Sequence, residues 1–360
     1  MRASVHRGLF GGIAVVLAMA ALGRWLADWT GTSLMGFEKS PLSGVLFAIL
    51  LGIVMANAAP SIADRAVPAL SLCTTTILRA GIVLLGFRLS LATASALGLA
   101  ALPVVALCIV VALAIVTVTG RAFGLSRELG ALIAVGTSIC GVTAIAATAP
   151  LIRAREVEVS YATACISLFG LAALLVYPSI ADALFRHDPR LAGMFLGTAI
   201  HDTTQVAGAA LMYQEQFHAH GALEAATVTK LVRNLCMAFV IPAVAMLYRD
   251  TDRDGDVRAA ARPAVVPLFV VGFAAACALR SIGDASDTPF GVLSPDGWRA
   301  FLACAQTSSE WALTIAMAAV GLGTRFAAFR ALGWRPLALG LIAAGLVGVV
   351  SSLAISFGFS

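Results

Sequence analysis

The stretch "GTAIHDTTQV", residues 197–206, sets a histidine beside an aspartate inside a long apolar segment. Its polar side chains recur at i, i+3, i+4 and i+7, the spacing of one helix face: Thr198, His201, Asp202 and Gln205. Gly197 and Gly208 flank this face and indicate that the helix is interrupted here. What the polar face does depends on what surrounds it.

The composition identifies the surroundings as a membrane. The chain has 360 residues, 60% of them hydrophobic and 12% charged, whereas soluble domains are roughly 45–50% apolar. Apolar segments recur, each long enough to cross a hydrocarbon core of about 30 Å. The sequence therefore predicts an all-α membrane protein with about eleven transmembrane helices, at residues 8–28, 40–57, 68–88, 101–122, 128–152, 157–181, 191–213, 224–248, 264–282, 299–323 and 336–358.

In such a protein an ionised carboxylate at mid-bilayer costs roughly 2.5–3.5 kcal/mol, so it normally faces a partner or a water-filled cavity. Asp202 is therefore a candidate functional residue. The alternative is a helix end near the membrane interface, where His201 and Asp202 would simply be solvated.

The net charge is +5, but the arginines lie at the ends of apolar segments, so topology explains them better than a nucleic-acid partner does. With a cytoplasmic N-terminus, the inside loops hold Arg2, Arg7, Arg65, Arg121, Arg127, Arg186, Arg190, Arg249, Arg253, Arg258, Arg262, Arg325, Arg330 and Arg335. The outside loops hold Arg24, Lys39, Arg88, Arg153, Arg155, Arg280 and Arg299. The positive-inside rule favours this orientation, with the C-terminus outside.

Two short internal matches suggest a repeat. "TTTILRAG" (74–81) resembles "VTKLVRNL" (228–235), and "TSICGVTAIAATA" (137–149) resembles "TSSEWALTIAMAA" (307–319). Both pairs are five spans apart, and an odd separation gives an inverted 5+5 repeat with one additional helix. Chance similarity between helices rich in small residues is the alternative. The predicted units are 1–39 for the N-terminal extra helix, 40–181 for the first repeat and 182–360 for the second.

A second candidate break lies in "VGTSICGVTAIAATAP", residues 135–150, where glycines alternate with small polar residues. Gly permits unwound backbone, and the N-terminus of a following half-helix attracts anions. Close helix packing through small residues is the alternative. Because the repeat pairs this segment with 307–319, we expect discontinuous helices in both spans, crossing near mid-membrane.

Charged residues also enter the apolar segments. Lys230 and Arg233 share one helix face and Arg79 lies deeper, while Asp202 and Glu310 supply negative charge. The net excess of one positive charge suits an anionic ligand, although compensated ion pairs with nothing bound also fit. Alternatively, Lys230 extends its ammonium group to the membrane interface and has no role in ligand binding.

Four motifs resemble a known family: "LRAGIVLLGFRLS", "GTSICGVTAIAATAPLI", "GTAIHDTTQVAGAA" and "TVTKLVRNLCM". Together, from about Pro41 to the end, they are similar to the YeiH family of bacterial inner-membrane proteins, which are regarded as sulfate exporters. The resemblance implies a multi-spanning transporter with a panel and a core domain, related to cation/proton antiporters and bile-acid symporters. The motifs carry over onto Thr137, Ser138, Cys140, Gly141, His201, Asp202, Lys230 and Arg233. Thr203 and Thr204 depart from the family pattern, which puts the substrate in question rather than the fold.

We therefore expect a secondary active transporter of a small anion, of sulfate or sulfonate type, coupled to protons or sodium. The expected substrate-binding residues are Thr137, Ser138, Cys140, Gly141, Thr143, Lys230, Arg233, Asn234, Thr307 and Ser308. The expected ion-coupling residues are His201, Asp202, Gln205 and Glu310, and Arg79 is an intramembrane charge.

A cation/proton antiporter that uses Asp202 as its ion-binding carboxylate is the alternative function. No nucleophile or zinc-protease motif accompanies His201 and Asp202, so an enzyme is not expected. The cysteines lie in apolar segments without a C-x-x-C pair, so neither a disulfide framework nor a zinc site is expected. No cofactor is expected either. The oligomeric state is open, with a homodimer compatible.

Overall fold

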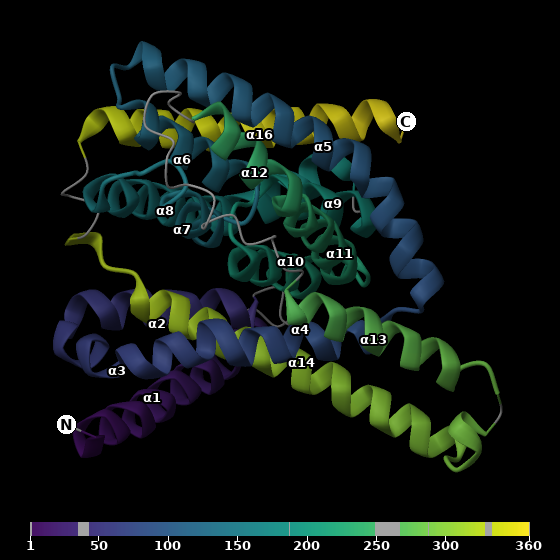
Figure 1. Ribbon diagram of the computed structural model, residues 1–360. Coiled ribbons are helices and arrows are strands. Elements are labelled where there is room, and N and C mark those ends of the chain that lie inside the picture. Colours follow the sequence, from purple (N-terminus) through teal and green to yellow (C-terminus); the bar gives the residue numbers. More distant parts are fainter. Residues whose placement is uncertain are drawn as a thin grey trace.

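The computed structural model describes residues 2–34, 43–186, 188–248, 267–286, 288–327 and 333–359. These residues form helices packed in two bundles (Figure 1). Several arginines used above to predict topology, and Lys39, lie outside the described residues: Arg249, Arg253, Arg258, Arg262 and Arg330.

The panel bundle comprises α1 (Arg2–Asp28), α2 (Gly44–Ala58), α3 (Pro60–Leu72), η2 (Cys73–Ile77), α4 (Leu78–Leu85), η3 (Gly86–Arg88), α13 (Leu268–Gly283) and α14 (Pro295–Gly323). The core bundle comprises α5 (Leu91–Ala122), α6 (Arg127–Ser138), α7 (Val142–Thr148), α8 (Glu156–Phe185), α9 (Pro189–Ala199), α10 (Thr203–Phe217), α11 (Ala222–Leu235), α12 (Met237–Leu247) and α16 (Trp334–Gly358). Each bundle thus mixes elements from both halves of the chain.

Six of the described helices are long and apolar enough to cross a membrane, and two shorter apolar helices, α2 and α13, accompany them. Large apolar side chains on these helices, such as Phe239, Leu99 and Val110, remain exposed on the outside of the bundles. A surface of this kind needs a hydrocarbon solvent. The expected class, an all-α membrane protein, is therefore confirmed, whereas the number of eleven transmembrane helices stays a prediction.

The predicted span at 128–152 is a hairpin formed by α6 and α7, here called hairpin 1, and the turn between its two helices is its tip. A Cβ at Gly136 of α6 would lie 2.9 Å from the Ile145 side chain of α7, whereas nine residues of continuous helix would separate them by about 13 Å. Ser126, before α6, donates to Glu158 at the start of α8 (2.6 Å). Hairpin 1 therefore enters and leaves the core bundle at the same end.

The predicted span at 191–213 is also a hairpin, formed by α9 and α10 and here called hairpin 2. Cβ atoms at Gly193 and Gly197 of α9 would approach Ala225 and Thr229 of α11 within 2.8 and 2.7 Å, so α9 and α11 run in the same direction. Because only residues 218–221 join α10 to α11, α10 must return to the end where α9 began. Hairpin 2 enters opposite hairpin 1, since α8 connects the two ends.

The hairpins change the predicted topology of two loops but not of the termini. Arg153 and Arg155 move to the end that holds the N-terminus, and Arg186 and Arg190 move to the end that holds the C-terminus. The expectation for these four side chains is thus corrected, because a hairpin returns the chain to its starting side. Figure 1 shows the termini at opposite ends of the bundles, here called the N-terminal and C-terminal sides.

The discontinuity expected at 299–323 is wrong, because α14 is uninterrupted. Its small polar residues bond within or between helices instead of marking a break: Thr314 donates to Glu310 O (2.8 Å) and Ser309 to Gly81 O (2.7 Å). The two sequence matches also pair elements from different bundles, α4 with α11 and α6 with α14. The repeat boundaries stay a prediction.

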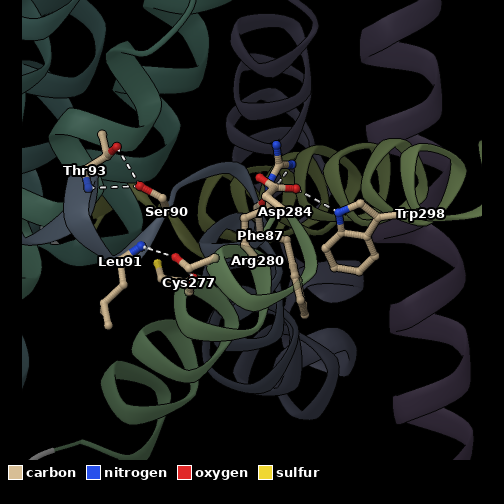
Figure 2. Close-up of polar contacts among 9 residues, drawn as sticks. Phe87, Ser90, Leu91, Thr93, Cys277, Arg280, Asp284 and Trp298 are labelled. Carbon is tan, nitrogen blue, oxygen red and sulfur yellow. Dashed lines mark hydrogen bonds and ion pairs between the residues drawn. The ribbon is translucent and has the colours of Figure 1, made fainter. Parts of the chain in front are cut away.

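The C-terminal side of the panel bundle is tied by a carboxylate between α13 and α14. Asp284 accepts hydrogen bonds from Arg280 (2.5 Å) and Trp298 (2.9 Å), as Figure 2 shows. Partial burial opposes ionisation, but these hydrogen bonds hold the pKa of Asp284 below its usual range. Ser281 accepts from the backbone N–H of Leu91 (2.8 Å), which fastens the start of α5 to α13 (Figure 2).

Backbone contact between α2 and α14 sets the geometry of the panel bundle. A Cβ at Gly321 would lie 2.2 Å from Ile49 O, and one at Gly52 would lie 2.6 Å from Ala318 O. We predict that Gly321→Ala lowers stability by about 1–3 kcal/mol through overpacking. The matched control is Gly345→Ala in α16, which meets nothing within 4 Å. Thermal unfolding in detergent measures both, and equal midpoints would contradict the close approach.

Candidate functional site

A cavity of about 1310 Å³ lies between the panel bundle and the core bundle. Its panel wall is formed by α3, η2, α4 and parts of α13 and α14, and its core wall by α8, α11, α12 and the tips of both hairpins. Val67 of α3 and Arg325, which follows α14 and binds Asp64 near the start of α3, line it toward the N-terminal side. The cavity therefore extends from mid-bundle toward that side.

The tips of the two hairpins meet on the cavity. Gly141 is the turn residue of hairpin 1 and has a φ of 68°, a left-handed conformation that glycine adopts without strain. Asp202 is the matching residue of hairpin 2, and a Cβ at Gly141 would lie 3.4 Å from its Oδ2. The positive φ therefore favours glycine at this position, and the short distance to Asp202 shows that the two tips lie side by side.

Polar groups from both tips line the cavity: Cys140, Thr143, Asp202, Thr203, Thr204 and Gln205. Asn234 of α11 also lines it and donates to Thr203 Oγ1 (3.3 Å), which leaves the threonine hydroxyl proton free for another acceptor. Hydroxyl and amide donors thus stand beside one carboxylate on the core wall.

Asp202 is also the N-cap of α10. Its Oδ1 accepts the backbone N–H of Thr204 (2.8 Å), and Gln205 Oε1 accepts the N–H of Asp202 (3.4 Å). Gln205 in turn donates to Ser167 O of α8 (3.3 Å). The predicted helix face of Thr198, His201, Asp202 and Gln205 is therefore not formed, because the chain leaves the helix between α9 and α10. Asp202 and Gln205 instead form a capping box at the start of α10, with the carboxylate half-buried at the cavity.

Behind the tips, two fully buried cations of α11 bind carbonyls at the ends of α6 and α9, the first helix of each hairpin. Lys230 Nζ donates to Ile139 O (2.9 Å), Ile200 O (3.1 Å) and His201 O. The ammonium thus has a carbonyl partner from each hairpin, one in hairpin 1 and two in hairpin 2.

Arg233 binds the same two breaks with its planar fork. Its Nε donates to Ser138 O (2.7 Å), its Nη1 to Thr198 O (2.7 Å) and Ile200 O (2.9 Å), and its Nη2 to Thr137 O. The last carbonyls of a helix have no intrahelical partner and carry partial negative charge. Arg233 and Lys230 satisfy these groups for α6 and α9 together.

This arrangement changes the roles expected for several residues. Lys230 and Arg233 are 1% and 0% exposed and lie outside the lining of the cavity, so the expectation that they touch an anion is not met in this conformation. Thr137 and Ser138 are buried behind the tips, where they present backbone carbonyls to Arg233. Their side chains do not reach the cavity because α6 ends there and the turn residues follow.

His201 and Asp202 are separated by the same turn. His201 is fully buried, and its carbonyl accepts from Lys230, whereas Asp202 lines the cavity. Thr307 and Ser308 are exposed on the continuous helix α14 and do not line the cavity, so their expected place at a second helix break is wrong.

Glu310 belongs to a charged contact that closes the C-terminal side. Arg88 of η3 pairs with Glu224 of α11 (2.6 Å) and lies 3.7 Å from Glu310 of α14. Ser43, before α2, donates to Glu215 of α10 (2.7 Å). These contacts join the panel bundle to the core bundle. Arg88, Glu224 and Glu215 were not predicted as site residues from the sequence, because they lie at the ends of predicted spans or just beyond them.

The fold and the site define an all-α membrane protein in which two opposed hairpins meet on a cavity between two bundles. Its family follows from sequence comparison. The family described as "Conserved hypothetical protein 698" matches residues 11–340, and the chain belongs to this family. The resemblance to the YeiH family is thereby confirmed.

Relatives cover most of the chain. The match to a UPF0324 membrane protein of Streptococcus pneumoniae is 33% identical over 298 residues and covers 82% of this chain and 84% of the relative. The match to the UPF0324 membrane protein TauZ of Paracoccus pantotrophus is 31% identical over 336 residues and covers 92% of this chain and 90% of the relative. A Pseudomonas aeruginosa relative is 30% identical over 310 residues, with 84% and 82% covered. No solved structure matches the chain.

We predict that Lys230→Met and Arg233→Met each lower the stability of the protein strongly. Each leaves buried carbonyls of both hairpins without donors, at about 1–3 kcal/mol for each group. Arg233→Lys should lose less, because one ammonium replaces part of the fork. Thermal unfolding in detergent is the measurement, with Arg299→Met as control, since Arg299 is largely exposed. Unfolding midpoints equal to that of the control would contradict the bracing role.

Proposed function

We propose that the chain is a secondary active transporter of a small anion, of the sulfate or sulfonate type, in the bacterial inner membrane. The observation that carries the proposal is the meeting of two opposed hairpin tips on a cavity between two bundles. Interrupted backbone at membrane depth is tolerated where it lines a water-filled cavity, and transporters place substrate sites at such breaks.

The donors on the core wall support an anion as substrate. Thr143 and Thr203 supply hydroxyls, Asn234 supplies an amide, and two buried cations lie directly behind the tips. Among the described residues that line the cavity, Asp202 supplies the one carboxylate. The balance of charge over these described residues around the tips is therefore positive, which favours an anion.

The arrangement of the bundles supports alternating access. The cavity extends to the N-terminal side, while Arg88, Glu224, Glu310, Ser43 and Glu215 hold the bundles together on the C-terminal side. Movement of the core bundle against the panel bundle would break these contacts and carry the tips to the opposite side. Alternating access in secondary transporters commonly uses such rigid-body rocking around a central site.

The carboxylate of Asp202 at the cavity also favours a second candidate, the cation/proton antiporter. In that case Asp202 would bind the cation and exchange it for a proton, and the donors would position water. The two functions differ in which ion stabilises the purified protein and which gradient drives flux.

For the anion transporter we expect radioactive sulfate or sulfonate uptake into proteoliposomes that responds to an imposed pH gradient. Asp202→Asn should abolish gradient-driven uptake but keep anion exchange, because a permanently neutral side chain mimics only the protonated state. The fold should survive, since asparagine also caps helices well. Full gradient-driven uptake by Asp202→Asn would reject the coupling role, and sodium/proton exchange without anion flux would favour the antiporter.

The proposed orientation places the N-terminal side in the cytoplasm, because the positive-inside rule still favours it after the loop corrections. A cysteine at Arg186 should then react with a membrane-impermeant maleimide in whole cells, and a cysteine at Arg153 only after lysis. Both variants need Cys304→Ser, since Cys304 is exposed. The reverse labelling pattern would reject this combination of orientation and hairpins, and labelling of both sites in intact cells would contradict the crossing of α8 between them.

A further inference from the structure

We infer that Arg79 of α4 is the cation that contacts the transported anion, in place of the buried pair Lys230 and Arg233. The inference rests on the proposed function and names the residue that selects for negative charge. Arg79 lines the cavity from the panel wall, whereas the hairpin tips line it from the core wall. An anion between them would touch both bundles.

Arg79 has a free guanidinium in the described structure. Its described contact is with the ring of Phe269, which also lines the cavity, at 5.9 Å from the ring centroid. Within the described ranges no hydrogen bond or ion pair involves its side chain, and the residue is exposed. Its charge is thus available to a ligand that enters the cavity.

The other arginines near the site are occupied. Arg325, which also lines the cavity, binds Asp64 and Pro60 O, both at 2.7 Å. Arg88 binds Glu224, and Arg233 is enclosed by backbone carbonyls. These partners neutralise the charges and fix the side chains, so recruiting any of them would break an existing contact. Arg79 needs no such exchange.

A charged side chain at the position of Arg79 is energetically unfavourable unless it faces a partner or a cavity. It lies within "CTTTILRAGIVLLGF", well inside an apolar segment, where an arginine is tolerated if it faces a cavity or a partner. Asp202 lines the same cavity but forms no ion pair with Arg79 among the described contacts. A bound oxyanion would supply the missing partner, since the planar guanidinium fork matches sulfate, sulfonate or carboxylate oxygens in pairs.

A ligand held in this way would bridge the moving parts. Arg79 belongs to the panel bundle, and Thr143, Thr203 and Asn234 belong to the core bundle. Binding would therefore favour the conformation in which the two walls are close. A cation would be repelled by Arg79 and, among the described lining residues, would find a carboxylate at Asp202 alone.

The test compares Arg79→Gln and Arg79→Lys with Arg65→Gln, an exposed arginine of the same bundle that does not line the cavity. Purified proteins are assayed for anion-induced thermal shifts with sulfate, methanesulfonate and acetate, and for sulfate uptake in proteoliposomes. Arg79→Gln should raise KM and the anion concentration at half-maximal shift by about tenfold or more, the size expected for one charged hydrogen bond. Arg79→Lys should recover part of the loss, and Arg65→Gln should match the wild type.

The ligand-free unfolding midpoint of Arg79→Gln should stay near that of the wild type, because the side chain holds no structural partner. Wild-type anion binding together with unchanged KM in Arg79→Gln would overturn the role of Arg79 alone. Absence of any anion response in the wild type, in both assays, would overturn the proposed function and this inference together. A lower maximal rate with unchanged KM would assign Arg79 to conformational change rather than binding.

Discussion

The structure depends on two cations that bind the ends of two broken helices. Lys230 and Arg233 lie one turn apart on α11 and donate to carbonyls of both α6 and α9. Within a membrane protein no bulk water is available for these carbonyls, and each unsatisfied group costs several kcal/mol. The breaks can exist because α11 supplies their donors. Both hairpin tips are thereby held in one place, beside the same stretch of one helix.

This bracing separates structural charge from functional charge. The buried pair compensates helix ends and stays out of the cavity, while Arg79 and Asp202 face the cavity from opposite walls. The carboxylate of Asp202 is itself committed in part, because it caps α10. A residue that must both cap a helix and respond to a ligand links occupancy of the cavity to the stability of the hairpin. The site is therefore polar on one wall and cationic on the other.

The contacts on the C-terminal side have a different character. Arg88, Glu224 and Glu310 are largely shielded from solvent, with side-chain exposures of 11%, 7% and 21%. Separating such a pair has a low cost only where both charges reach water or a new partner, because an unpaired buried charge is unfavourable. The close backbone contacts of Gly52 and Gly321 belong to a rigid interface within the panel bundle. The molecule thus combines close backbone packing within the panel bundle with a small set of polar contacts between the bundles, which must exchange partners if the bundles move relative to each other.

The sequence by itself determined the class and the family, and it indicated breaks within 135–150 and between Gly197 and Gly208. It also predicted a break in 307–319 that α14 does not have. Apolar segments of span length and glycines among small polar residues are features of local composition, so the sequence shows them directly, but small polar residues alone do not tell a break from a packed helix.

Only the tertiary structure decided the direction of the chain after each break, because a segment that turns back has the same composition as one that crosses. It also decided that α14 is continuous, since Thr314 and Ser309 bond to carbonyls and interrupt nothing. The partners of Lys230 and Arg233 come from residues about 30 to 90 positions away in the sequence. Whether a buried cation binds a carbonyl or a substrate depends on which groups surround it, and folding alone brings those groups together.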